Sequence, residues 1–188
     1  MDMHDDNGIN YLILDENGDL NMSMNYRKEG QKLPLFGVGP YLVWGIGLIT
    51  LIGIILTYSI LESGAVHGVF EVIFHIIGGV LIILGIAVWY IGAVKSNMDE
   101  CITENKLQTN GIYGSVRNPM YSGWWILLTG ISLQWHNLWL LFLIPINWLI
   151  MTVVLINTEE KWLLNLYGEP YATYKKQVNR LIPWKRRG

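Results

Sequence analysis

Four apolar stretches alternate with polar connections along the chain. They cover Val38–Leu61, Val69–Val94, Tyr121–Leu133 and Leu138–Ile156. About 20 apolar residues in a helix cross the hydrocarbon core of a membrane, and the first two stretches exceed that length, so each can cross with some tilt. We therefore expect an all-α, polytopic integral membrane protein with about four transmembrane helices, five being the alternative count.

The third stretch is shorter than the first two. Counted from Pro119 to Trp135 it has about 17 residues, or roughly 25 Å of helix, before Trp135-His136-Asn137 turns the chain. Either a complete crossing or a shallow helical hairpin returns the chain to the side that it left. Under both interpretations, the polar segments before Pro119 and after Ile156 lie on one side of the membrane.

Basic residues occupy only alternate connections. None of the thirteen Lys and Arg residues lies within an apolar stretch, and none lies in Glu62–Gly68 or Gln134–Asn137. Four crossings place all basic segments on one side, which the positive-inside rule makes the cytoplasmic side. We expect both chain termini to lie there, with the polar chemistry of the protein gathered at that face.

Composition narrows the classes of function further. A net charge of −2 gives no basis for binding nucleic acid, and the single Cys101 excludes an internal disulfide. Without a second thiol most structural zinc sites are excluded as well, so we expect no metal site. We expect a polar N-terminal segment over residues 1–36 and one membrane domain over residues 37–188.

Three local patterns predict structure within these segments. Asn17-Gly18 is a good two-residue turn, so residues 11–14 and 19–22 predict a small β-hairpin, with a mobile tail as the alternative. Glu71 and His75 lie four residues apart near the outer end of the second stretch, as a structural pair at the interface or a proton site. Small residues let membrane helices approach closely, and the glycines predicted to mark such contacts are Gly45, Gly47, Gly53, Gly78, Gly79, Gly85 and Gly92.

A polar block, residues 104–123, leads into the third stretch. It is rich in amide and hydroxyl side chains, and Asn118 and Pro119 match the N-cap and first residue of a helix. The free N–H groups of such a helix end can hold an anionic group, although an ordinary capped loop explains the same residues. The block by itself leaves both interpretations open.

A second polar block follows the fourth stretch and begins with Glu159-Glu160. Gly168 is placed to end a helix and Pro170 to begin the next. The spacing of three tyrosines puts them on one helix face: Tyr167, Tyr171 and Tyr174. The basic ending, Lys185–Arg187, is typical of a tail attracted to anionic membrane lipids. Anchoring does not explain the paired carboxylates, which we therefore interpret as candidate site residues.

Both blocks carry spaced motifs. The first reads Leu107-Gln108-Thr109-Asn110-Gly111-Ile112-Tyr113 and then Arg117-Asn118-Pro119-Met120-Tyr121-Ser122-Gly123. The second has Glu159-Glu160, Leu163, Tyr167-Gly168, Tyr171 and Tyr174, followed by Val178, Arg180 and Ile182-Pro183-Trp184. In order and spacing these residues resemble the isoprenylcysteine carboxyl methyltransferase family and its phospholipid methyltransferase relatives, within a motif-bearing core at residues 95–184. The ending is similar to that of short archaeal members, one of which has a known structure.

The resemblance implies S-adenosylmethionine as methyl donor, with S-adenosylhomocysteine as product, in a cytoplasmic pocket formed by the last helical hairpin and the C-terminal helices. Accordingly, the chain has no strand-linked G-x-G-x-x-G pattern of a soluble cofactor domain. The resemblance suggests the helix start at Asn118 for the methionine carboxylate, Glu159 for the ammonium group or ribose, and Tyr113 for adenine. The full set of implied cofactor contacts is Asn105, Lys106, Leu107, Gln108, Tyr113, Asn118, Pro119, Met120, Tyr121 and Glu159.

Two positions depart from the family pattern. Asn118 stands where many members have His, and Leu155 stands where eukaryotic members have an Arg thought to orient the substrate. We expect Arg180 to take over that role by bidentate pairing with an acceptor carboxylate. The predicted catalytic residues are therefore Glu159, Glu160 and Arg180.

The predicted reaction is carboxyl O-methylation of a lipid-linked or amphipathic, isoprenylcysteine-like substrate that enters from the bilayer. A carboxylate is already ionised, so alignment and removal of water carry the reaction, whereas an amine needs a base. No His lies in either motif, which favours the carboxylate. Lipid N-methylation and a non-catalytic membrane scaffold are the alternatives.

Overall fold

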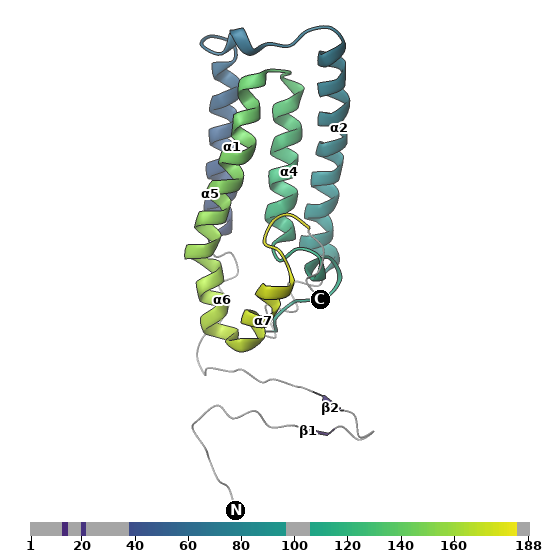
Figure 1. The fold of residues 1–188 in the computed structure, drawn as a ribbon, viewed down its shortest axis with the longest axis vertical. Coiled ribbons are helices and arrows are strands. Elements are labelled where there is room, and N and C mark those ends of the chain that lie inside the picture. The colour runs from purple at the N-terminus through teal and green to yellow at the C-terminus, as the bar shows by residue number, and fades with distance from the viewer. Residues whose placement is uncertain (1–12, 15–19, 22–37, 97–105, 184–188) are drawn as a thin grey trace, which may run out of the picture.

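The computed structural model describes residues 13–14, 20–21, 38–96 and 106–183. The long helices of the described chain form an elongated bundle, and the short helices α6 and α7 lie at one end of it (Figure 1). In chain order the helices are α1 (Gly39–Leu56), α2 (Val69–Tyr90), α4 (Pro119–Gln134), α5 (Leu143–Asn157), α6 (Glu159–Tyr167) and α7 (Glu169–Gln177). A π-helical turn, Ile91–Lys95, continues α2, and 3-10 turns occur at Glu62–Gly64, Gly111–Gly114 and Leu138–Phe142.

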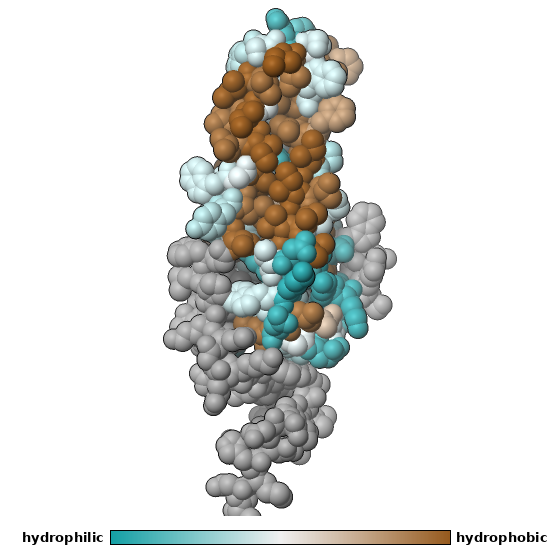
Figure 2. Space-filling model, turned by 90° about the vertical axis from the view of Figure 1, so that its left-hand side faces the viewer, coloured by the Kyte–Doolittle hydropathy of each residue, from teal (hydrophilic) through white to brown (hydrophobic). Residues whose placement is uncertain are grey.

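In the part of the chain that the structure describes, three helices are long and apolar enough to cross a membrane. They are α1, α2 with its π-helical turn, and the run Leu138–Tyr167 that contains α5. Large apolar side chains on these helices point outward; Trp44 is 78%, Phe70 65% and Ile83 69% exposed. Figure 2 shows the apolar surface as a band over the bundle, with hydrophilic side chains below it. Lipid accommodates such a surface and water does not, so the fold is that of a polytopic helical membrane protein, as predicted.

α4 has 16 residues and is shorter than these helices, as its sequence predicted. Its far end nevertheless reaches the connection between α1 and α2. The Val66 N–H donates to the His136 carbonyl at 2.8 Å, and Asn137 Nδ2 donates to the Leu61 carbonyl at 2.7 Å. The turn between α4 and α5 therefore lies level with the ends of α1 and α2, which argues against a shallow hairpin. The number of membrane crossings stays a prediction.

Glycines bring α2 and α4 together backbone to backbone. A Cβ on Gly85 would lie 2.7 Å from the Gly123 carbonyl oxygen, and one on Gly130 would lie 2.7 Å from that of Gly78. Only glycine fits so close an approach. The predicted helix contacts are confirmed at Gly53, Gly78, Gly85 and Gly92. The prediction is wrong for Gly45 and Gly79, where an added Cβ would meet no atom within 4 Å because these positions face away from the other described helices.

The N-terminal strands β1 (Ile13–Leu14) and β2 (Leu20–Asn21) pair antiparallel, as the predicted hairpin requires. The predicted two-residue turn does not fit the observed pairing. A two-residue turn at Asn17-Gly18 would put Leu14 opposite Asn21, but Leu14 is opposite Leu20. This register leaves an odd number of residues between the strands, which a two-residue turn cannot provide. The turn itself lies outside the described residues.

Candidate active site

The two polar blocks of the sequence meet at the end of the bundle where α6 and α7 lie. The Arg117 N–H donates to the Asn179 carbonyl at 2.8 Å, and the Asn118 N–H donates to the Arg180 carbonyl at 3.1 Å. Val116 and Asn179 form a parallel bridge at the same place. Backbone hydrogen bonds thus hold the segment before α4 against the C-terminal segment.

Asn118 precedes α4, as predicted, but its side chain does not cap the helix. Its Nδ2 donates to the Arg180 carbonyl at 3.3 Å, and it makes no hydrogen bond to the first turn of α4. Pro119, the first residue of α4, has no N–H. The first N–H groups of a helix have no partner inside the helix. Within the described part of the chain, those of Met120 and Tyr121 are therefore available to an anionic group.

Tyr121 and Glu159 connect α4 to α6. The α-helix breaks at Thr158, which makes Glu159 the first residue of α6. The Tyr121 hydroxyl donates a hydrogen bond to Glu159 Oε1. Tyr121 is 8% exposed and Glu159 is half-buried. Two predicted cofactor contacts from separate motifs thus lie in direct contact.

Glu160 is the centre of a buried ion cluster, formed with Arg117, Lys175 and Arg180. The Glu160 side chain is 2% exposed, with Arg117 Nη2 at 3.0 Å from Oε1 and Lys175 Nζ at 3.0 Å from Oε2. Arg180 donates to both oxygens, from Nε to Oε1 and from Nη2 to Oε2, the latter at 3.1 Å. Two of the predicted catalytic residues, Glu160 and Arg180, are therefore partners of each other.

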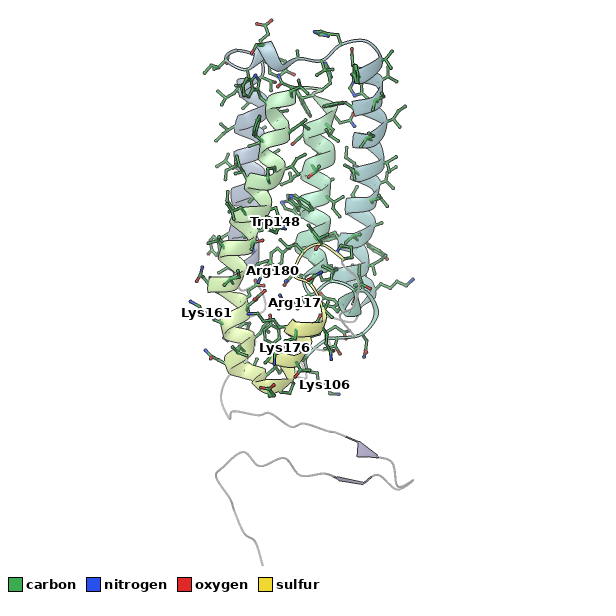
Figure 3. The ribbon with its side chains drawn as sticks, viewed as in Figure 1. Lys106, Arg117, Trp148, Lys161, Lys176 and Arg180 are labelled. Atoms are coloured by element: carbon green, nitrogen blue, oxygen red, sulfur yellow. The ribbon has the colours of Figure 1, made fainter. Side chains whose placement is uncertain are left out.

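The ion cluster carries an excess of positive charge, because three cations and one carboxylate leave a net charge of +2. The Arg117 side chain is 5% exposed, and its buried Nε has no hydrogen-bond partner among the described residues. An unpaired buried donor is costly unless an acceptor reaches it. Figure 3 shows Arg117 and Arg180 close to each other where α7 meets the bundle. The cluster can therefore bind an anionic group.

The tyrosines of α6 and α7 pack together next to this site. As their spacing predicted, Tyr167, Tyr171 and Tyr174 lie in one buried cluster, which also contains Leu166 and Val178. The Tyr174 hydroxyl donates to the Tyr113 carbonyl at 2.6 Å, and Arg117 Nη1 donates to the Tyr171 hydroxyl at 3.4 Å. Burial raises the pKa of Tyr171 to about 12 despite the nearby Arg117 charge, so the phenol stays neutral near pH 7.

The loop before α4 holds the other predicted cofactor contacts. Gln108 Nε2 donates to the Ser96 carbonyl at 2.6 Å, and the Tyr113 hydroxyl donates to the Gly92 carbonyl at 3.3 Å. Tyr113 is 4% exposed, and its contact with adenine stays a prediction. Among the rest, Asn105 lies outside the described residues, Lys106 is exposed, Leu107 and Met120 are half-buried, and Pro119 is buried.

Sequence reasoning missed Arg117 and Lys175 as site residues. Both bind Glu160, and both belong to segments that the sequence had singled out. A buried carboxylate requires cationic or hydrogen-bonding partners, so its burial would have pointed to nearby basic residues. No sequence spacing reveals that burial, because the fold of α7 back onto α6 creates it.

A family model matches the middle of the chain. The phospholipid methyltransferase model matches residues 72–170, just over half of the chain, from α2 to the start of α7. The chain belongs to the phospholipid methyltransferase family. The family match contains the Tyr121–Glu159 contact and Glu160, and it ends before Lys175 and Arg180.

Curated relatives extend the comparison. The protein-S-isoprenylcysteine O-methyltransferase of Schizosaccharomyces pombe is 32% identical over 101 residues, covering 50% of this chain and 38% of the relative. The methanethiol S-methyltransferase of Crocosphaera subtropica is 37% identical over 84 residues, covering 44% and 31%. The protein-S-isoprenylcysteine O-methyltransferase of Dictyostelium discoideum is 29% identical over 120 residues, covering 52% and 50%.

These matches bear on only part of each protein. The matched region spans about a third to a half of the length of these relatives. No solved structure matches the chain. The expected likeness to a short archaeal member of known structure is therefore not found, whereas the family itself is as predicted.

Proposed function

We propose that the chain is an S-adenosylmethionine-dependent membrane methyltransferase that methylates a carboxylate on a lipid-linked, isoprenylcysteine-like substrate. The observation that carries this proposal is the hydrogen bond between Tyr121 and Glu159 beside the ion cluster of Glu160. It joins two family motifs in one polar site at the end of an apolar bundle. The names of the family and of its relatives support the reaction class.

The donor set of the site fits the amino-acid end of S-adenosylmethionine. Its carboxylate suits the first N–H groups of α4 and the cationic Arg117, whose buried Nε lacks a partner in the described structure. The Glu159 carboxylate suits the ammonium group or the ribose hydroxyls. When bound, the cofactor supplies a methyl group that is already electrophilic. The residues of this chain then align the acceptor and exclude water from it.

Glu160 is a positioning residue in this proposal, and Arg180 is the residue that it positions for the substrate. Both oxygens of Glu160 are engaged, so the carboxylate fixes its cations instead of meeting the substrate. Arg180 uses Nε and Nη2 for Glu160 among the described residues, which leaves the N–H groups on Nη1. These donors are our candidates to steer an acceptor carboxylate, as the sequence analysis expected of Arg180.

The charge of the site favours a carboxylate acceptor. The ion cluster has a net charge of +2, which falls to +1 when the Glu159 carboxylate is counted with it, so the site still attracts an anion. A carboxylate needs no base, whereas an amine or thiol must lose a proton before it attacks. His67, His75 and His136, the histidines that the structure describes, lie at the opposite end of the bundle, so none of these three is placed to act as that base. Thiol methylation is the second candidate, because one relative is named a methanethiol S-methyltransferase.

We further propose that the site faces the cytoplasm and that substrate reaches it from the bilayer. Figure 3 shows Lys106, Arg117, Lys161, Lys176 and Arg180 at the end of the bundle with α6 and α7. Basic residues retained at one end mark the cytoplasmic side. A lipid tail can then stay beside the apolar helices while its polar head enters the site.

A methyl-transfer assay tests the proposed function. Purified full-length protein in lipid vesicles would receive S-adenosylmethionine with a radiolabelled methyl group and one of three acceptors: an S-farnesylated N-acetylcysteine, phosphatidylethanolamine or methanethiol. We expect a base-labile ester on the first acceptor and loss of methyl transfer in Glu159→Gln. The control variant Glu169→Gln changes an exposed carboxylate in the same way and should transfer methyl groups as wild type does. Transfer only to the amine or the thiol would overturn the carboxylate assignment. Absence of transfer and of cofactor binding would favour a non-catalytic scaffold.

A further inference from the structure

Three histidines gather at the end of the bundle opposite the candidate active site. His67 precedes α2, His75 lies in α2, and His136 lies in the turn between α4 and α5. Figure 1 shows the α1–α2 connection and this turn at the same end, away from α6 and α7. The chain has only four histidines, so their gathering from separate segments calls for an explanation.

Glu71 completes a group with two of these histidines. The ligand atoms of Glu71, His75 and His136 all lie within 4.8 Å of one another. Glu71 Oε1 is 4.0 Å from His75 Nε2, and the rings of His75 and His136 have centroids 5.2 Å apart. Two imidazoles and one carboxylate form the ligand set of many zinc sites that keep a position open for water.

Gln134 orients His75 for this role. His75 Nδ1 is 3.0 Å from Gln134 Oε1, and Gln134 Nε2 donates back to the His75 carbonyl at 3.1 Å. An amide oxygen only accepts, so Nδ1 carries the proton and Nε2, on the side of Glu71, keeps its lone pair. Metal-binding histidines have this kind of partner on the second ring nitrogen. Gly78 makes room for Gln134, since a Cβ there would lie 2.5 Å from its Nε2.

His136 is held in an unusual backbone conformation. Its φ of 35° is the one positive value at a non-glycine position in the described chain. The Val66 N–H donates a hydrogen bond to the His136 carbonyl at 2.8 Å, and His136 Nδ1 lies 3.3 Å from the Gln134 carbonyl oxygen. A carbonyl again only accepts, so Nε2 of His136 is the nitrogen with the lone pair. Backbone strain of this kind gathers at binding sites, where the surroundings over-determine it.

We propose that Glu71, His75 and His136 bind one divalent transition-metal ion of the zinc class at the face opposite the methyl-transfer site. The ion ties the start of α2 to the turn between α4 and α5, and water fills the remaining position. The site is partly open to solvent, because the His75 and Glu71 side chains are 44% and 38% exposed, so an ion can enter from water. The sequence predicted no metal because Cys101 is its single thiol, whereas this site uses imidazole and carboxylate from segments far apart in the chain.

Zinc titration of the purified full-length protein tests the proposal. The protein would be free of affinity-tag histidines, stripped with chelator and titrated with zinc chloride in a calorimeter. We expect one zinc ion per chain, and binding at least about tenfold weaker in His75→Ala and Glu71→Gln. His4→Ala is the matched control and should bind as wild type does. Cobalt should give the intense visible absorption of four-coordinate sites in wild type and in His4→Ala, and should not give it in His75→Ala or Glu71→Gln.

The same titration can overturn the proposal. Wild type that takes up no zinc, or His75→Ala that binds zinc as tightly as wild type, would show that the cluster is an ordinary interfacial pair. Loss of binding in His4→Ala with retention in His75→Ala would place the ion on the N-terminal segment. Since Glu71 and His75 are partly exposed, both variants should fold, and helical circular dichroism would check this.

Discussion

Replacing Glu160 by Gln should destabilise the protein strongly, although the new side chain has nearly the same shape. The carboxylate is 2% exposed and is bound by Arg117, Lys175 and Arg180. A neutral amide cannot compensate these charges. The variant would leave cations from the α4 entry, from α7 and from the C-terminal segment beside one another without an anion.

The magnitude depends on how far each partner is buried. Lys175 is 41% exposed, so solvent screens its pair with Glu160, and its share is at most about 1 kcal/mol. Arg117 is 5% exposed, and removing one partner of such a buried pair costs about 3–5 kcal/mol, because the other charge stays uncompensated. At about 2–4 °C per kcal/mol for a chain of this length, the Tm should fall by about 6–20 °C.

Thermal unfolding in detergent, followed by helical circular dichroism, measures this effect. We expect a large fall of the Tm for Glu160→Gln, a fall of a few degrees at most for Lys175→Met, and no change for the exposed Glu169→Gln. A Tm for Glu160→Gln within about 2 °C of wild type would refute the idea that this ion cluster joins the segments around the site.

Gly85→Ala should destabilise the fold by about 1–3 kcal/mol and lower the Tm, because the added methyl group would meet the backbone of α4, whereas Gly79→Ala should leave the Tm unchanged. Thermal unfolding of the two variants measures this, and an equal fall of the Tm in both would contradict the close contact of α2 and α4. Tyr121→Phe should weaken binding of S-adenosylhomocysteine by roughly tenfold in calorimetry, since Glu159 loses the donor that orients it; unchanged affinity would make that hydrogen bond irrelevant to the cofactor. A cysteine introduced at Ser63, in a background without the native cysteine, should react with a membrane-impermeant maleimide added outside intact cells, and reaction only from the cytoplasmic side would invert the proposed orientation.

The fold was largely predictable because the length of an apolar stretch indicates whether a helix can cross the hydrocarbon core of a membrane. The stretch Val69–Val94 matches α2 with its π-helical turn closely. The stretch Val38–Leu61 was too long for a helix prediction, since α1 ends at Leu56 and the apolar sequence continues through turns. Hydropathy does not mark where a helix ends. Turn chemistry does so at Gly168, whose φ of 60° ends α6 as predicted.

The residues of the candidate site were predictable only where they belong to one of the two sequence motifs. The motifs singled out Tyr121 and Glu159, and the structure brings the two into contact. The partners of Glu160 were not predictable, because Arg117 and Lys175 reach it through the fold of the loop before α4 and of α7. Glu71 and His75 were singled out as a pair, but their approach to His136 was not predicted, since the three residues come together only when the helices pack.

Calorimetric titration of S-adenosylhomocysteine into the detergent-solubilised protein decides whether Glu159 and the start of α4 form a cofactor site. Glu159→Gln keeps the size of the side chain and removes its charge. The loss of a charged hydrogen bond costs about 1.5–3 kcal/mol, so we expect roughly 10- to 150-fold weaker binding, with an unchanged Tm because Glu159 is only half-buried at a helix end. Equal affinities of wild type and Glu159→Gln for S-adenosylhomocysteine would show that Glu159 does not contact the cofactor. A wild-type protein that does not bind S-adenosylhomocysteine would contradict the methyltransferase assignment itself.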